Sequence, residues 1–413
     1  MKIRYSAGSS RGVSCIKGKK MYSLLLAVIY LAFISLGLPD SLLGAGWPSM
    51  HTALGAPLSS AGIISMIISG ATIVSSLLSE RMTRKFSAKY VVLFSVILSS
   101  ASLFAFSKSN SFLLLCILGI PYGFAAGSID AALNNYVALH YNSRHMSWLH
   151  CFWGVGAIVS PYIMSLSLTY STWRTGYFTV SMIQIGIAVI LAATVPLWRV
   201  NKDPAEEAGE NTGSLGIMAA LRIRGVPSVL FGFLGYCAAE WTCMLWAASY
   251  LTETRGVTEE RAAAFASLVF IGLTVGRFIA GFFSERAGDR NMIRAGTAVV
   301  AVGIIMIAVP ALPEFFSLAG FVVIGFGFAP VYPSIIHSTP HNFGKTASQA
   351  IIGMQMAFAY VGSMFAPALF GLISSYTGLW IMPFYLAAFF VLMIIMIETA
   401  FRNANNKKDG PAS

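Results

Sequence analysis

Apolar residues occur in this chain as long continuous runs separated by short polar segments. A helix needs about 20 mostly apolar residues to cross the roughly 30 Å hydrocarbon core of a bilayer. Twelve such runs are recognisable: 22–44, 58–79, 90–106, 112–137, 146–167, 176–197, 228–251, 261–283, 292–309, 316–336, 346–374 and 380–399. Because the runs are continuous rather than alternating strands of about ten residues, a membrane β-barrel is excluded. The pattern predicts an all-α integral membrane protein.

The composition supports this prediction. Of 413 residues, 56% are hydrophobic and 10% are charged, whereas soluble domains carry about 25% charged residues. The first apolar run follows Lys20 and is too long for the core of a cleaved signal peptide, and no small-residue cleavage motif follows it. It is therefore interpreted as the first span. The five cysteines show no metal-binding spacing, and no disulfide is expected.

The net charge of +11 is unevenly distributed. If the N-terminus is cytoplasmic, 22 of the 27 lysines and arginines fall in cytoplasmic segments and four in external loops. The remaining one, Arg277, lies inside a predicted span. This asymmetry is typical of membrane proteins and argues against nucleic acid as a partner. We expect a multi-pass protein of the cytoplasmic membrane with both termini in the cytoplasm.

The longest internal polar stretch, which contains Pro204 and several Glu and Gly residues, divides the chain near its middle and is interpreted as a flexible linker. The predicted organisation is a basic tail (1–20), an N-terminal six-helix bundle (21–198), a cytoplasmic linker (199–224), a C-terminal six-helix bundle (225–400) and a second cytoplasmic tail (401–413).

The two halves repeat each other at a nearly constant offset. Residues 79–81 (Ser-Glu-Arg) recur at 284–286, an offset of 205, and His150 aligns with Gln355 at the same offset. Gly156 and Pro161 align with Gly362 and Pro367 at 206. Two parallel six-helix repeats imply pseudo-two-fold symmetry about the membrane normal, with a site at the interface.

One of the repeated segments carries a family signature. Gly281-Phe-Phe-Ser-Glu-Arg-Ala-Gly-Asp-Arg290 resembles the loop motif of the major facilitator superfamily, in which glycines flank an acid and an arginine and further basic residues follow. The first copy, residues 76–85, departs from the motif at Ser76 and Thr83, which replace the glycines, and at Glu80, which replaces an aspartate. The resemblance implies a gating role for charged residues of both copies: Glu80, Arg81, Arg84, Glu285, Arg286 and Arg290.

A finer resemblance is to the fucose:proton symporter group. It rests on Asp40 in the first span, on Gly127-Ser-Ile-Asp-Ala-Ala-Leu-Asn-Asn-Tyr136 in the fourth, and on Gly325-Phe-Gly-Phe-Ala-Pro-Val-Tyr-Pro333 in the tenth. Members of this group have an acid in each of the first and fourth spans and mostly import sugars with protons. The resemblance implies the same chemistry here.

Three acids within spans are candidate proton carriers: Asp40, Asp130 and Glu240. An ionisable side chain inside a span costs several kcal/mol and persists where it faces a partner or water. Asp130 and Asn134 share a helix face with Gly123 and Gly127, which fits either a proton site or polar contacts between helices. Asp40 follows Pro39, and it could instead be a hydrated acid near the helix end.

Glu240 is expected near the middle of its span without a nearby cation, an environment that favours the protonated carboxyl. Arg277 lies about two turns before the cytoplasmic end of its span. We expect its side chain to extend to the inner interface, the alternative being a pair with a buried acid.

Candidate substrate-binding residues combine aromatic rings with amide, imidazole and hydroxyl groups, as a carbohydrate site would require. They are Asn134, Asn135, His150, Trp153, Gln355, Tyr332 and Tyr360. The aromatic residues could instead mark membrane interfaces.

We therefore predict a secondary active transporter that moves a small polar solute, most simply a sugar, with protons or, as the alternative, sodium ions. Two alternatives are a proton-coupled exporter of drugs or amphiphilic compounds and a non-transporting membrane receptor. No phosphate-binding loop of an ATP-driven pump is present, and no catalytic residues, metal site or cofactor are expected. A closed twelve-helix unit is expected to act as a monomer.

Overall fold

The computed structural model of the protein describes residues 9–57, 60–200 and 215–405, with the backbone alone for 9–20, 199–200, 259–260, 263–267 and 405. The first half contains α1 (Ser9–Gly37), α2 (Leu42–Ala53), α3 (Ala61–Lys108), α4 (Phe112–His140), α5 (Ser143–Tyr170), α6 (Trp173–Thr194) and η2 (Val195–Val200). After the linker come α8 (Ile217–Leu221), α9 (Val226–Arg255), α10 (Glu259–Ala287), α11 (Asp289–Ala308), α12 (Glu314–Phe328), α13 (Val331–Phe343), α14 (Lys345–Thr377), η3 (Leu379–Ile381) and α15 (Met382–Asn405).

Among the described residues, eleven helical segments are long and apolar enough to cross a membrane, and α3 supplies two crossings. Its 48 residues would extend roughly 70 Å as one straight helix, more than twice the membrane core. The helix breaks at Ser87. Its first part runs parallel to α4, since Ile68 packs on Gly123 and Ser76 bonds Gly127. Its second part must run back in the opposite direction, because it ends at Lys108, just before α4 begins. The two parts of α3 are therefore two spans, and all twelve predicted spans are present.

The position of this break explains the imperfect first copy of the loop motif. In the second half the chain turns at Gly288, with φ 76° and ψ 154°. Thr83 occupies the matching position, and there the helix continues for four more residues to Ser87, with φ 64° and ψ 148°. Because residues other than glycine rarely adopt this conformation, the serine holds a strained backbone.

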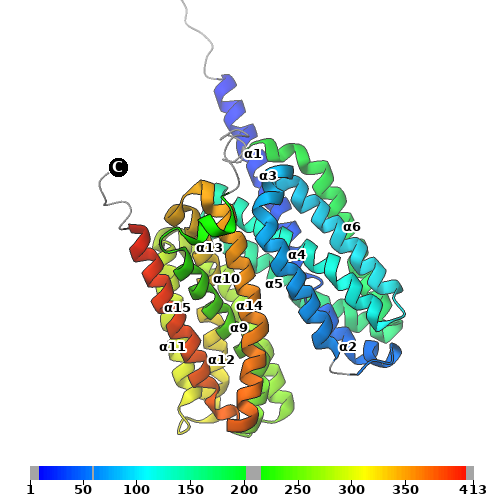
Figure 1. The fold of residues 1–413 in the computed structure, drawn as a ribbon, viewed down its shortest axis with the longest axis vertical. Helices are drawn as coiled ribbons and strands as arrows, with labels where there is room; N and C mark the ends of the chain where they lie inside the picture. Colours follow the sequence, from blue (N-terminus) through cyan, green and yellow to red (C-terminus); the bar gives the residue numbers. More distant parts are fainter. Residues whose placement is uncertain (1–8, 58–59, 201–214, 406–413) are drawn as a thin grey trace, which may run out of the picture.

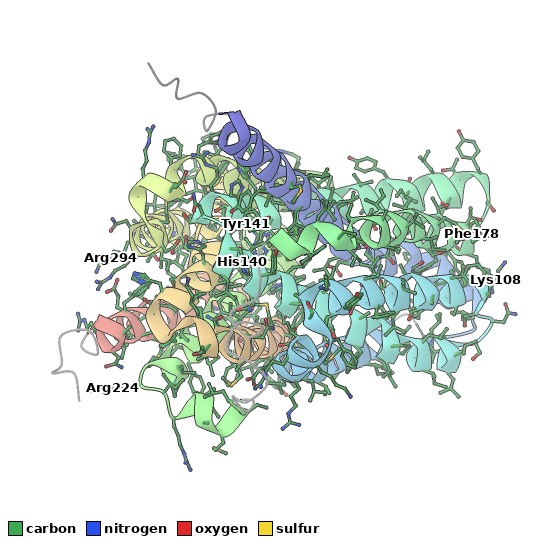
Figure 2. The ribbon with its side chains drawn as sticks, turned by 90° about the horizontal axis from the view of Figure 1, so that it is seen from above. Lys108, His140, Tyr141, Phe178, Arg224 and Arg294 are labelled. Carbon is green, nitrogen blue, oxygen red and sulfur yellow. The ribbon has the colours of Figure 1, made fainter. Side chains whose placement is uncertain are left out.

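The helices form two bundles, α1–α6 and α9–α15, that meet at one end and diverge toward the other (Figure 1). The chain enters α9 and leaves α15 at the end where the bundles meet, which we call the linker end. Viewed from above, His140 and Tyr141 lie where the bundles meet, whereas Lys108 and Phe178 lie at the far extreme of the N-terminal bundle (Figure 2).

Packing confirms the internal repeat. A Cβ atom on Gly156 of α5 would lie 2.5 Å from the carbonyl oxygen of Ile34 in α1. A Cβ on Gly362 of α14 would lie 2.6 Å from the carbonyl oxygen of Leu234 in α9. The aligned glycines therefore allow the same close helix contact in each bundle, between its fifth and first spans.

Two spans are discontinuous within the residues that the structure describes. The first breaks between α1 and α2 at residues 38–41, which include Pro39 and Asp40. The tenth breaks between α12 and α13 at Ala329 and Pro330. Broken helices are typical of binding sites in membrane carriers, because they expose backbone and side-chain polar groups at mid-membrane depth.

The ends of the predicted segments differ in detail. From Ser9 the N-terminal tail is helical and continuous with the first span, and the C-terminal helix extends to Asn405. Residues 1–8, 201–214 and 406–413 of the predicted tails and linker lie outside the described residues.

Candidate functional site

Asp130 lies on the face of α4 that packs against α3. Gly123 and Gly127 permit this approach, since a Cβ on either would lie 2.2 Å or 2.4 Å from an α3 carbonyl oxygen. One turn further on, the Asn134 amide donates to Asp130 Oδ1 at 2.7 Å. The spacing of four residues places the two side chains on one face of the helix, and both are buried.

The Asp130–Asn134 pair continues into both bundles. The Tyr360 hydroxyl of α14 donates to Asp130 Oδ2 at 3.3 Å. Asn134 Oδ1 lies 3.0 Å from His150 Nε2 of α5. The His150 ring meets the Tyr332 ring of α13 edge-on, with centroids 4.7 Å apart. A hydrogen-bonded chain therefore joins α14, α4 and α5, and a ring contact extends it to α13.

The C-terminal bundle contains a matching bond. Gln355 Oε1 accepts a hydrogen bond from the Thr339 hydroxyl at 3.0 Å, and Thr339 aligns with Asn134 at the same offset of 205. Gln355 is fully buried, and its Nε2 has no hydrogen-bond partner among the described residues. It supplies a polar group to the core of the opposite bundle, as the repeat predicted.

Asp40 is exposed at the break between α1 and α2. Its carboxylate accepts hydrogen bonds from the Tyr122 hydroxyl at 3.3 Å and from Trp153 Nε1 at 2.8 Å. The Trp153 ring in turn lies 5.6 Å from the Arg277 guanidinium of the other bundle. Trp153 therefore connects Asp40 of the N-terminal bundle with Arg277 of the C-terminal bundle.

Glu240 and Arg277 form a buried ion pair. Arg277 Nη2 lies 3.4 Å from Glu240 Oε1, and the two side chains are 4% and 5% exposed. The Tyr236 hydroxyl also donates to Glu240, at 2.8 Å. Two expectations are corrected: Glu240 has a cation beside it, and Arg277 does not extend to the membrane interface. The reason is that Arg277 lies on the face of α10 that packs against α5.

Asn135 lies apart from this cluster. Successive helix residues are turned by about 100°, so Asn135 points toward α14, where its Oδ1 accepts from the Ser348 hydroxyl at 2.6 Å. Next to it Gln349 bonds Ser79 at 3.3 Å. These bonds join the bundles between Asp130 and the linker end.

The predicted gating residues have different partners. Glu285 of α10 receives hydrogen bonds from Arg144 at 2.7 Å and from Asn142, both in the N-terminal bundle. Glu80 accepts from the Leu215 amide of the linker at 2.8 Å, and Arg290 pairs with Glu398 of its own bundle at 2.6 Å. Arg81, Arg84 and Arg286 are exposed at the linker end.

Several residues that join the bundles were not predicted. Asn142 and Arg144 bind Glu285, and His337 Nε2 lies 3.1 Å from the Tyr141 carbonyl oxygen. Trp148 donates to the Phe278 carbonyl at 3.1 Å. No spacing in the sequence points to these pairs, because the partners lie on different bundles. Arg144 appeared in the sequence only as one of many basic residues expected on the inner side.

Loss of the Arg144–Glu285 pair should have a small effect. Both side chains are more than one-third exposed, and exposed pairs contribute about 0.2–1 kcal/mol. We expect Arg144→Gln or Glu285→Gln to reduce the population closed at the linker end by less than about fivefold, since 1.4 kcal/mol is tenfold. Distances between spin labels on the two bundles measure this population. Arg261→Gln is the control, because Arg261 pairs with Glu314 within one bundle; an equal effect there would contradict a gating role.

Comparison with known proteins places this geometry in context. The family profile described as Major Facilitator Superfamily matches residues 29–351 and again residues 229–412. The chain is 23% identical over 399 residues to the yeast protein named bypass of stop codon protein 6, covering 88% of this chain and 79% of that one. It is also 23% identical to the probable sulfoacetate transporter SauU of Cupriavidus necator, covering 88% and 90%.

Solved structures show the same fold. The crystal structure of FucP in its outward conformation superposes with a TM-score of 0.75 at 15% identity, covering 92% of this chain and 99% of that one. A variant of this Escherichia coli fucose:proton symporter superposes with a TM-score of 0.72 at 17% identity, with the same coverage.

Proposed function

This chain belongs to the major facilitator superfamily and is thus a multi-pass membrane transporter rather than an enzyme, and we propose that it carries a small polar solute together with protons. Transport would proceed by alternating access, in which the two bundles rock about a site at their interface. We place the protein in the cytoplasmic membrane with both termini in the cytoplasm, since the distribution of lysine and arginine supports that orientation.

The observation that carries the proton coupling is the hydrogen-bonded chain through Asp130. One carboxylate oxygen binds Asn134 within the N-terminal bundle, and the other accepts from Tyr360 across the interface. A carboxylate only accepts hydrogen bonds, whereas a carboxylic acid also donates one. Gain or loss of a proton at Asp130 therefore changes the bond that joins the bundles, which is the link that a proton-driven carrier requires.

The contacts between the bundles support an outward-facing state. The hydrogen bonds described above between α4–α5 and α10–α14 lie between the Asp130–Tyr360 bond and the linker end. In the proposed orientation this end faces the cytoplasm, so the cytoplasmic side is closed. Asp40, beyond these contacts, is exposed, as a group that receives protons from the outside would be.

The residues around Asp130 favour a polar solute over an amphiphile. Asn134 and His150 supply amide and imidazole groups, Gln355 supplies an unpaired amide nitrogen from the other bundle, and Trp153 supplies an indole ring that bonds Asp40. The similar proteins include a fucose:proton symporter and a probable sulfoacetate transporter, and both solutes are small and polar. Uptake of a sugar-like solute is therefore preferred to export of a drug.

Uptake into proteoliposomes under an imposed pH gradient tests the proposal. A panel of labelled sugars and sugar acids, with the external side acidified, should show at least one solute accumulating above its external concentration. Collapse of the gradient with a protonophore should abolish that accumulation. Accumulation that ignores the pH gradient but follows a sodium gradient would contradict proton coupling.

A further inference from the structure

One face of α10 packs along α5 of the opposite bundle. Thr274 contacts Gly154, whose added Cβ would lie 2.5 Å from the threonine hydroxyl. Nearer the linker end, Phe278 and Glu285 also contact residues of the N-terminal bundle. Arg277 lies within this stripe, three residues after Thr274. Its side chain therefore faces the interface between the bundles, at the level of the polar cluster.

The hydrogen-bonding capacity of Arg277 is largely unused. A guanidinium has five N–H donors, and Arg277 directs one nitrogen toward Glu240, at 3.4 Å. Charge-assisted bonds of this type are usually about 2.7–2.9 Å long, so the pair is loose. Its Nε and Nη1 are buried and have no hydrogen-bond partner within the described part of the chain. Burying such donors without partners is costly.

Aromatic rings rather than acceptors cover this guanidinium. The rings of Trp153 and Tyr332 lie 5.6 Å and 5.8 Å from it, one on each bundle. Trp153 is only partly buried, and its indole N–H is held by the exposed Asp40. Movement of this one ring would open a path from the Asp40 side to the two unpaired nitrogens.

We propose that the transported solute is an organic anion, and that its carboxylate or sulfonate binds Arg277. This rests on the proposed symport. The forked geometry of the guanidinium matches two oxygens of such a group. Each fork of Arg277 combines Nη2 with either Nε or Nη1, so release of Nη2 by Glu240 would complete a fork with one of the two unpaired nitrogens. His150, whose ring contacts Tyr332 beside Arg277, and Asn134, which bonds His150, then supply polar groups for the remainder of the solute, which suits a hydroxylated acid.

Glu240 links this binding to the proton. In the structure Glu240 partly neutralises Arg277. A proton taken up by the Glu240 carboxylate leaves the arginine charge without a counter-ion, and the anion of the solute then takes that place. The titratable groups that interact with the pair are Tyr236, Cys237 and Cys243 on the helix of Glu240, Tyr332 on α13, and His150 and Cys151 on α5. Uptake of a proton by Glu240 and entry of the negative charge of the solute are therefore linked.

Matched pairs of solutes test the inference. Each pair differs by a carboxylate in place of a hydroxymethyl group: glucuronate and glucose, galacturonate and galactose, gluconate and glucitol. We expect uptake of an acid but not of its neutral partner. Arg277→Gln should raise the KM for that acid about ten- to hundredfold, the effect of losing a charged hydrogen bond, and Arg277→Lys should restore part of the affinity.

Further variants separate binding from folding and coupling. Glu240→Gln imitates the protonated acid, so the KM for the acid should not rise, while the pH gradient should no longer drive accumulation. The double variant Arg277→Gln with Glu240→Gln leaves no unpaired buried charge, and its thermal unfolding reports whether the bundle is intact. Arg261→Gln, an exposed arginine, is the control for net charge.

The outcomes distinguish the inference from the proposed function. Proton-driven uptake of a neutral sugar with an unchanged KM in Arg277→Gln would overturn the anion inference and leave symport standing. Acid uptake that requires Arg277 but ignores the pH gradient would overturn proton coupling and leave the anion inference standing.

Discussion

Gly353→Leu will hold the two bundles apart at the linker end. A Cβ on Gly353 of α14 would lie 2.4 Å from the Ser76 carbonyl oxygen and 2.5 Å from the Ser79 hydroxyl, both in the opposite bundle. Backbone atoms cannot move aside as a flexible side chain could. Overpacking of this kind costs about 1–3 kcal/mol, so the closed population should fall about 5- to 150-fold.

Distances between spin labels at positions 85 and 286 measure this shift, since Lys85 and Arg286 are both exposed at the linker end on different bundles. The label distance should lengthen in Gly353→Leu, and solute uptake should fall. Gly186→Leu is the matched control, because a Cβ on Gly186 would meet nothing within 4 Å. An unchanged distance distribution in Gly353→Leu would refute the assignment of this contact to the gate.

Asp130→Asn is expected to keep the exchange of solute across the membrane but to lose the accumulation of solute driven by a pH gradient. The asparagine keeps the shape of the side chain and resembles the protonated acid, so the bonds to Asn134 and Tyr360 can be replaced by similar ones. Because it cannot release a proton, uptake driven by a pH gradient should fall to the level of empty vesicles. Exchange of labelled for unlabelled solute at equal pH should continue, and its rate should lose the pH dependence seen in the native protein.

The control is Glu253→Gln, which removes an exposed carboxylate at the end of α9. It should leave both activities unchanged. If Asp130→Asn still accumulates solute against its gradient, Asp130 is not the coupling residue, and Asp40 or Glu240 must carry the proton alone.

The fold was predictable because the features that determine it can be read directly along the sequence. Run lengths set the spans, and a nearly constant offset of 205 or 206 relates the halves. The break in α3 was less predictable. Its place depends on which residue tolerates a positive φ, and Ser87 rather than Thr83 takes that role.

The site was predictable where one helix determines it. Asp130 and Asn134 are four residues apart on α4, and they form a bond. Arg277 was misplaced, because its distance from the helix end indicates depth but not the face that it occupies. That face is set by Gly154 on α5, 123 residues earlier in the chain. The partner of Glu285 likewise depends on how the two bundles meet.

The bond between Glu80 and the Leu215 amide ties the connecting segment to the N-terminal bundle, while α8, two residues later, packs against α9 and α14 of the other bundle. This segment is therefore attached to both bundles at the closed linker end. When the linker end opens, one of its two attachments must release. A fluorophore on residues 215–225 would then report each turnover of the carrier, without any label near the solute.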